Sequence, residues 1–192
     1  MKSIISTLAV IFLLCIAITG CKKDKNDTKK NVLKVDGTEY DISKGFLQYY
    51  GGNGSVYNID LNLISSGITV HETLGLPDSA SGIGHAIYFE MYTSSIDKLA
   101  LGDYTYNFSS QAAGSFDYAD YILNWNLSQQ HNPTFIEITS GTVKVIKSGA
   151  EYELSFSGTD KNNKAISGYY KGSLTYYYQS QAKKSQMLKR TR

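Results

Sequence analysis

Apolar and polar residues alternate in several short stretches along this chain. In residues 56–65, for example, Ile59 and Leu61 alternate with Asn58 and Asp60. A period of two is typical of a β-strand with one face on the core and the other toward solvent. The same pattern recurs closer to the C-terminus, and no stretch after residue 31 has the apolar spacing of an amphipathic helix. The pattern therefore predicts an all-β domain.

The alternating stretches predict about nine to eleven short strands, joined by polar turns. The clearest stretches are residues 32–35, 38–42, 45–50, 56–65, 85–94, 116–127 and 166–178. Many short strands with hairpin connections favour an antiparallel β-sandwich, and a lipocalin-like β-barrel is the alternative. Periodicity does not separate these two architectures.

Glycine-containing segments indicate where the chain reverses or becomes irregular. Asp36-Gly37 predicts a two-residue hairpin turn between residues 32–35 and 38–42. Residues 67–84 contain a Pro-Asp-Ser sequence and four glycines, and are predicted to form a long irregular loop.

The segment 141–158 gives the clearest hairpin. A two-residue turn at Ser148-Gly149 would pair Val145 with Tyr152 on one face and Lys144 with Glu153 on the other. The residues expected to face the core are Val143, Val145, Tyr152, Leu154 and Phe156.

The N-terminal twenty residues have a different composition. Lys2 precedes an apolar run over residues 4–17, which is shorter than the roughly 20 residues of a membrane-spanning helix. The run ends in Ile18-Thr19-Gly20-Cys21. This order resembles a bacterial type II signal peptide, in which the cysteine is acylated and becomes the new N-terminus. The resemblance implies lipid attachment, including palmitate, at Cys21. The alternative is a buried helix or an uncleaved membrane anchor.

These features divide the chain into four segments. We expect a signal peptide over residues 1–20, an acylated cysteine and flexible tether over 21–31, a β-sandwich domain over 32–180, and a basic disordered tail over 181–192. Residues 22–31 contain no apolar side chain, which is typical of a disordered linker.

Charge is distributed unevenly along the chain. Residues 22–34 carry a net charge of +4, residues 35–182 a net −8, and residues 183–192 a net +5. The two basic ends are interpreted as solvated segments, or alternatively as segments that rest on anionic lipid head groups. Because the domain between them is acidic, no nucleic-acid partner is expected.

The candidates for catalysis and metal binding are few. Cys15 falls in the predicted signal peptide and Cys21 carries the lipid, so the mature chain has no thiol nucleophile. His71, His85 and His131 are scattered, without a metal-ligand spacing or a serine nucleophile motif. We therefore predict no catalytic residue, no metal site and no cofactor.

Two patterns of acidic residues leave alternatives open. Asp160, Asn162 and Asn163 have part of a calcium-loop spacing, but the glycine and distal glutamate are absent, which favours a turn. A pair of carboxylates suited to glycoside hydrolysis remains possible among fifteen acids in residues 35–182.

Tyrosine is abundant, with sixteen in 192 residues. Tyrosine rings beside Asn and Asp form sugar-binding platforms and protein interfaces. The strand parity places five of them as outward candidates for ligand binding: Tyr49, Tyr50, Tyr118, Tyr169 and Tyr177. The alternative is that tyrosine is present only as a good strand former.

The mature chain resembles small outer-membrane lipoproteins of the Bacteroidota. The resemblance rests on the lipobox and lysine-rich tether, on residues 35–40 (Val-Asp-Gly-Thr-Glu-Tyr), on residues 140–145 (Ser-Gly-Thr-Val-Lys-Val) and on residues 166–172. It implies a β-sandwich anchored by lipid to the outer membrane, on its periplasmic or cell-surface side. Asp78-Ser79-Ala80 is similar to an O-glycosylation motif of these bacteria, which makes Ser79 a candidate modification site; an ordinary turn is the alternative.

The sequence thus favours a non-catalytic, membrane-anchored lipoprotein that binds a glycan or protein partner in the cell envelope. One alternative is a cell-envelope glycan hydrolase, and another is a structural or adhesive surface subunit.

Overall fold

The computed structural model describes residues 29–129 and 133–178, and in these residues the protein is all-β, as predicted. Twelve strands are present there: β1 (Val32–Val35), β2 (Thr38–Asp41), β3 (Lys44–Asn53), β4 (Val56–Ile64), β5 (Ile68–Thr73), β6 (Leu76–Thr93), β7 (Gly102–Tyr106), β8 (Ser115–Asn126), β9 (Ile136–Lys147), β10 (Tyr152–Asp160), β11 (Ala165–Gly172) and β12 (Thr175–Tyr178). The predicted signal peptide, Cys21, His131 and the predicted tail lie outside the described residues.

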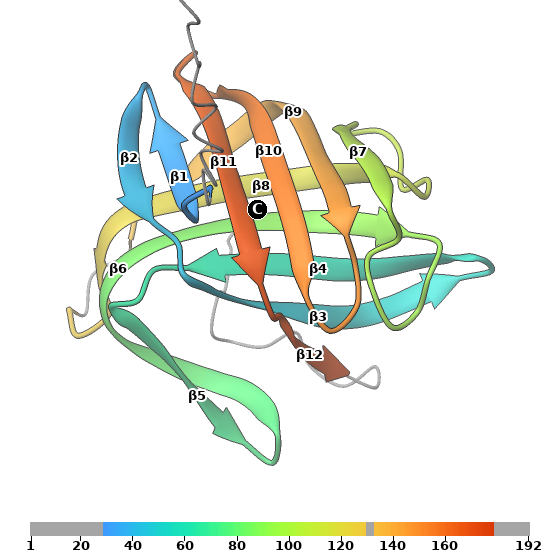
Figure 1. The fold of residues 1–192 in the computed structure, drawn as a ribbon, viewed down its shortest axis with the longest axis horizontal. Helices are drawn as coiled ribbons and strands as arrows, with labels where there is room; N and C mark the ends of the chain where they lie inside the picture. Colours follow the sequence, from blue (N-terminus) through green and yellow to red (C-terminus); the bar gives the residue numbers. More distant parts are fainter. Residues whose placement is uncertain (1–28, 130–132, 179–192) are drawn as a thin grey trace, which may run out of the picture.

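A single curled sheet supplies both layers of the fold. Its strand order is β12-β3-β4-β6-β8-β7-β9-β10-β11-β1-β2, and β5 pairs with the first half of β6. Figure 1 shows β9, β10 and β11 lying across β4, β6 and β8. Most pairs are antiparallel, but β12 runs parallel to β3 and β7 parallel to β8. The sequence predicted facing antiparallel layers; the structure has a mixed sheet that folds over on itself.

The core lies between the two layers of the curled sheet. The inward residues of β4 and β6, such as Ile59, Leu61, Ile87 and Phe89, pack with inward residues of the opposite layer such as Phe156. Phe89 and Phe156 approach to 5.4 Å between ring centroids. No helix long and apolar enough to cross a membrane occurs in the described part of the chain.

The first predicted hairpin is confirmed. Asp36 and Gly37 have φ angles of 52° and 80°, as a two-residue turn between antiparallel strands requires, and Val35 pairs with Thr38. Asn31, in the predicted tether, lies against the domain: its amide nitrogen donates to the Lys171 carbonyl at 3.0 Å.

The prediction of a loop over residues 67–84 was wrong. Most of this segment forms a projecting hairpin of β5 and the first half of β6, with Leu74 and Gly75 at its turn (Figure 1). Here the glycines allow strands to pair closely and do not mark an irregular loop. A Cβ on Gly82 would lie 2.1 Å from the Gly67 carbonyl oxygen, so only glycine permits this close approach.

The predicted register of the β9–β10 hairpin was also wrong, by two residues. Val145 lies opposite Leu154 rather than Tyr152, and Lys144 lies opposite Ser155 rather than Glu153. The connection spans residues 148–151, and a bulge follows between Glu153 and Leu154. A shift of two residues preserves the faces of both strands, so the five residues predicted for the core are buried as expected.

Candidate functional site

The outward face of β3, β4, β6 and β8 carries a continuous band of polar and tyrosine side chains. On β4, Ile59, Leu61 and Leu63 point into the core. Asn58, Asp60 and Asn62 alternate with them and so point to the opposite side. We call this band the polar face. It consists of Gln48, Asn58, Asp60, Asn62, Tyr88, Glu90, Tyr92, Asp117, Tyr118 and Asp120.

Strand register brings these residues into rows. One row runs Gln48–Asp60–Glu90–Tyr118 across the four strands, and its neighbour runs Asn62–Tyr88–Asp120 across three of them. Residues directly opposite on neighbouring strands are close enough for their side chains to interact. The polar face is therefore a property of the sheet, assembled from segments far apart in sequence.

Most of the polar face is buried, although the alternating pattern predicts that it faces solvent. Asn62 and Asp120 are each 1% exposed, and Gln48 is 3% exposed. Polar side chains of this kind are mostly found at the surface. The prediction that one face of residues 56–65 meets solvent was therefore wrong for Asp60 and Asn62, because β4 is buried on both faces from Ile59 onward.

Several buried polar atoms of this face lack a hydrogen-bond partner within the described chain. They are Gln48 Nε2, Asn58 Nδ2, both amide atoms of Asn62, and Asp117 Oδ1. More than nine in ten buried polar groups in native proteins are hydrogen-bonded, and leaving one unsatisfied costs roughly 1–3 kcal/mol. Atoms of this kind on one face mark a place where another molecule or segment can supply the missing bonds.

Tyrosine hydroxyls join the carboxylates of the face. The Tyr88 hydroxyl donates to Asp60 Oδ2 at 2.6 Å, and the Tyr118 hydroxyl donates to Asp120 Oδ2 at 3.0 Å. The Tyr92 hydroxyl donates to Asp117 Oδ2 at 3.0 Å. Burial and the neighbouring carboxylates, Glu90 first, raise the pKa of Tyr92, so this hydroxyl keeps its proton at physiological pH.

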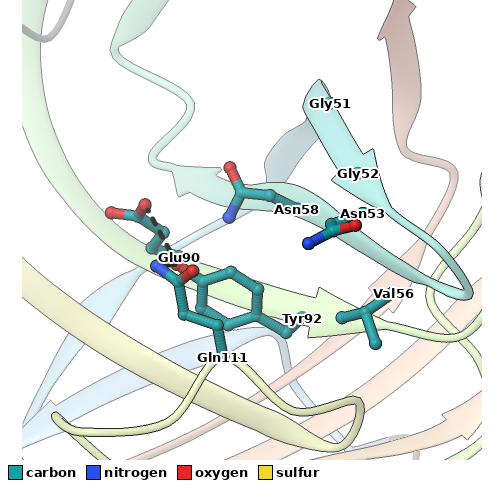
Figure 2. A pocket seen from close by; sticks show the side chains of 8 residues that line it. All are labelled: Gly51, Gly52, Asn53, Val56, Asn58, Glu90, Tyr92 and Gln111. Atoms are coloured by element: carbon teal, nitrogen blue, oxygen red, sulfur yellow. Dashed lines mark hydrogen bonds between the residues drawn. The ribbon is translucent and has the colours of Figure 1, made fainter.

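A depression of about 420 Å³ opens at one end of the polar face. Figure 2 shows Asn58 from β4, Glu90 and Tyr92 from β6, and Gln111 from the β7–β8 connection pointing toward it. Gln111 Nε2 donates to the Tyr92 hydroxyl at 2.8 Å and so holds the tyrosine against the connection. The volume lies within the range of small-ligand pockets.

Glycines form the far wall of the depression. Gly51 has a φ of 123°, a conformation that favours glycine, and it follows a bulge in the β3–β4 register. A Cβ on Gly52 would lie 2.5 Å from the Tyr57 ring, so only glycine fits there. The wall therefore presents backbone rather than side chains to anything in the depression.

The polar face belongs to the acidic part of the chain. Residues 45–143 contain nine Asp or Glu residues and one basic residue, Lys98. The strands β4, β6 and β8 contain no Lys or Arg. An electronegative surface of this kind attracts cations and repels anionic ligands.

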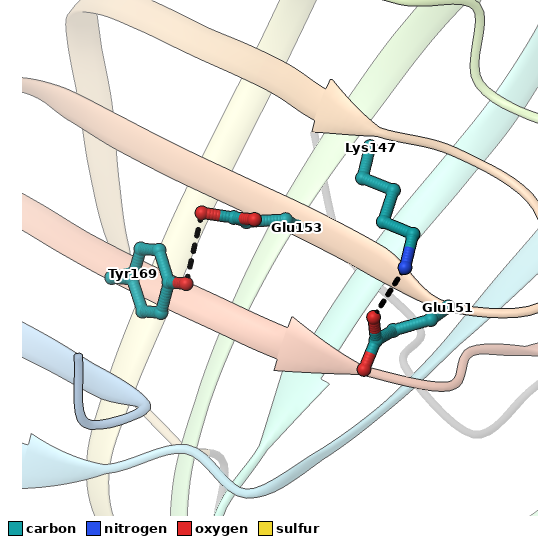
Figure 3. A network of polar contacts seen from close by, with 4 residues as sticks. All are labelled: Lys147, Glu151, Glu153 and Tyr169. Carbon is teal, nitrogen blue, oxygen red and sulfur yellow. Dashed lines mark hydrogen bonds and ion pairs between the residues drawn. The ribbon is translucent and has the colours of Figure 1, made fainter. Parts of the chain in front are cut away.

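The outward face of β9, β10 and β11 has a different character. Figure 3 shows Lys147 paired with Glu151 at 2.6 Å, and the Tyr169 hydroxyl donating to Glu153 Oε1 at 3.0 Å. Lys147 and Glu151 are exposed, and the Lys147 ammonium lowers the pKa of Glu151 through its hydrogen bond. These are ordinary solvent-facing contacts.

The five tyrosines predicted as ligand candidates do not converge. Tyr49 lies in the core cluster, which the parity count missed, and Tyr50 is half-buried at the adjoining bulge. Tyr118 lies on the polar face, whereas Tyr169 lies on the outward face of β11. Tyr177 packs edge-on against Phe46 and donates to Glu72, which ties β12 to the projecting hairpin.

The other sequence candidates are separate from the polar face. Ser79 is exposed on the projecting hairpin, opposite His71. His85 Nδ1 accepts from the Asn124 amide at 3.1 Å. Asp160 holds a turn: its Oδ1 accepts from the amides of Asn162 and Lys164, as the turn interpretation predicted. Across residues 29–129 and 133–178 no cluster of three metal-ligating side chains occurs.

Most residues of the polar face are neither aromatic nor part of a known motif, so the sequence did not mark them as site candidates. A usable signal was present in the composition of the outward positions. Asn58, Asp60 and Asn62 lie on a strand without a single Lys or Arg, whereas β9 carries Lys144 and Lys147 on its solvent side.

Comparisons of this chain with family models, with curated proteins and with solved structures found no match.

Proposed function

We propose that the protein is a lipid-anchored binding protein of the cell envelope, and that it binds a neutral or amino-substituted glycan on the polar face. The observation that carries the proposal is the set of buried side-chain amides that lack a partner within the described residues, Gln48, Asn58 and Asn62, of which Asn58 lines the depression. Each glycan hydroxyl both donates and accepts hydrogen bonds, as amide side chains do.

The chemistry of the depression supports a sugar over other small ligands. Asn58, Glu90 and Gln111 supply donors and acceptors from three separate segments, and the ring of Tyr92 supplies an apolar surface. The acidic surroundings disfavour sulfated, phosphorylated or carboxylated sugars. The preferred class is therefore an uncharged or cationic oligosaccharide.

Calorimetric titration with neutral, amino and acidic oligosaccharides tests the proposal. The chain from residue 21 with Cys21→Ser should bind at least one neutral or amino sugar, and Asn58→Ala should weaken that binding at least tenfold. Ser155→Ala, an outward change on β10, is the matched control and should leave affinity unchanged. Failure of every sugar to bind, or equal weakening by both variants, contradicts the proposal.

Anchoring is proposed from the lipobox and has its own test. In the full precursor, Cys21→Ala should abolish acylation and release the protein from membranes, whereas Cys15→Ala should not. Continued partitioning of the Cys21→Ala protein into the detergent phase contradicts lipid attachment at this residue.

Glycan hydrolysis is a second candidate, favoured by one contact. Glu90 and Asp117 both lie within hydrogen-bond reach of the Tyr92 hydroxyl, at 3.4 and 3.0 Å, so two carboxylates flank one point beside the depression. Hydrolysis by a carboxylate pair requires such proximity. Chromatography of a bound oligosaccharide after prolonged incubation decides between the two functions: cleavage that Glu90→Gln abolishes supports the hydrolase, and an intact sugar supports binding alone.

A further inference from the structure

The polar face combines negative charge with buried amides that lack partners. Asp60, Glu90, Asp117 and Asp120 contribute carboxylates to it. Asn62, at 1% exposure, has neither a donor nor an acceptor for its amide within the described chain. A peptide segment rich in Lys and Arg fits this combination, because its side chains pair with carboxylates and its backbone pairs with amides.

The chain carries such a segment directly after its last described strand. Residues 179–192 contain five basic residues and no acidic one; the basic residues are Lys183, Lys184, Lys189, Arg190 and Arg192. They follow β12, which pairs in parallel with β3 and places Tyr178 beside Tyr49. The rings of these two tyrosines stack at 4.8 Å. The segment therefore starts at the Gly51 end of β3, where the depression lies.

The length of the segment is sufficient to cross the face. Neighbouring strands lie about 4.8 Å apart, so four steps from β12 to β8 span about 19 Å. Fourteen residues reach at most about 46 Å when extended, and the four residues before Lys183 cover about 13 Å. The first lysines can thus reach β4 and β6, and the last basic residues can reach β8.

We propose that residues 183–192 dock across the outward face of β4, β6 and β8 in the same molecule. The basic side chains pair with the carboxylates of the polar face, and the segment's backbone bonds the amides of Gln48 and Asn62. Docking covers the depression, so the segment competes with a ligand for the polar face. The docking itself does not depend on glycan binding.

A spin label placed in the segment tests the docking. In the chain from residue 21 with Cys21→Ser, a label on Ser185→Cys should broaden the amide signals of residues 58–62, 88–92 and 117–120. It should spare residues 144–147 and 167–171 on the other layer. Absence of broadening, or equal broadening of both layers, overturns the proposal.

Charge variants separate docking from simple proximity. Replacing the five basic residues of 183–192 with Gln should abolish the broadening, and 0.5 M salt should reduce it. The matched control replaces Lys22, Lys23, Lys25, Lys29 and Lys30 with Gln and should leave it unchanged. Persistence of the broadening after neutralisation of the C-terminal segment overturns the proposal.

Ligand binding gives a separate readout of competition. If a sugar binds, the C-terminal neutralised variant should bind it several-fold more tightly than the parent chain; unchanged affinity contradicts docking over the depression. The label experiment contains no sugar, so the docking and the glycan proposal can fail independently. Transfer of the label to anionic vesicles, with no broadening in the domain, also overturns the docking.

Discussion

The outward faces of the two layers of this sheet are built from the same alternating pattern and yet differ in their chemistry. On the layer of β9, β10 and β11, Lys147 forms an exposed ion pair with Glu151 of the β9–β10 connection, and Glu153 accepts a partly buried hydrogen bond from Tyr169. On β4, β6 and β8, outward residues such as Asn62 and Asp120 are buried, and Asn62 lacks partners within the described chain. A period of two identifies which residues face the core, but it does not show that the opposite face meets solvent.

The contrast in basic residues follows the same division. Lysines accompany the acids on β9 to β11, whereas β4, β6 and β8 contain acids and amides without any Lys or Arg. A face that only has to be soluble mixes both charges. The absence of Lys and Arg from β4, β6 and β8 is therefore not what solubility alone requires.

The largest effect is expected in the core that both layers share. Leu154→Ala should lower the free energy of unfolding by roughly 2–5 kcal/mol, because Leu154 is fully buried between the layers. Chemical denaturation measures it. A loss below about 1 kcal/mol would mean that the two layers do not pack as described.

Asp160 links the core to a turn of the β9–β11 layer, and its loss should be nearly as costly. The Tyr121 hydroxyl donates to its Oδ2 at 2.7 Å, and two backbone amides donate to its Oδ1. Asp160→Ala should lower the free energy of unfolding by about 2–4 kcal/mol at pH 7, because these buried donors lose their acceptor.

The same residue predicts a pH dependence. Burial raises the pKa of Asp160. Hydrogen bonds from the Lys164 amide, the Tyr121 hydroxyl and the Asn162 amide lower it by more than burial raises it, so the pKa lies below its ordinary value of 3.8. A folded-state pKa below the unfolded value stabilises the protein above about pH 4, and this contribution is lost as the pH falls through the folded-state pKa. Denaturation at pH 7 and pH 2.5 should therefore show a smaller Asp160→Ala effect at the lower pH. An effect that is equal or larger in acid would contradict this role.

Asn62→Leu, on the polar face, should stabilise the protein, whereas the changes above destabilise it. Replacing a buried amide that lacks partners among the described residues with an apolar side chain should raise the free energy of unfolding by about 1 kcal/mol. It should also weaken ligand binding, as is common where a site is kept at the expense of stability. Ser155→Leu on the other layer is the control and should not change binding. Destabilisation by Asn62→Leu would mean that the amide is satisfied within the domain.

The smallest effect is expected at the exposed surface of β10. Glu153→Ala should change the free energy of unfolding by less than about 1 kcal/mol, because the carboxylate accepts a hydrogen bond from Tyr169 at a partly solvated position. If it proved more damaging than Leu154→Ala, the assignment of inward and outward faces in this hairpin would be reversed.

Local patterns in the sequence were sufficient for the all-β class, the Asp36-Gly37 turn and the inward residues of the β9–β10 hairpin. They were not sufficient where a distant segment decides the outcome. The β9–β10 register depends on a four-residue connection and a bulge rather than on the Ser148-Gly149 pair alone. The glycines of residues 67–84 suggest a loop, but Gly67 and Gly82 allow two strands to approach closely.

The polar face could not be predicted for the same reason. Its rows join residues from β3, β4, β6 and β8, and Gln111 reaches Tyr92 from the β7–β8 connection, nineteen residues away. Tyr49 and Tyr50 are adjacent, so strict alternation puts them on opposite sides of the strand, and the prediction that both face outward was wrong for Tyr49, which lies in the core. Register across strands, rather than periodicity along one strand, assembles the candidate site.

The most direct test of the account compares the two outward faces in one experiment. A sugar that binds the chain from residue 21 with Cys21→Ser is titrated while backbone amide chemical shifts are recorded. We expect shifts at residues 58–62, 90–92 and 111–118, around the depression, with residues 144–147, 153–155 and 169–171 unchanged. Shifts confined to the β9–β11 face, with no shift on the polar face, would contradict ligand binding on the polar face.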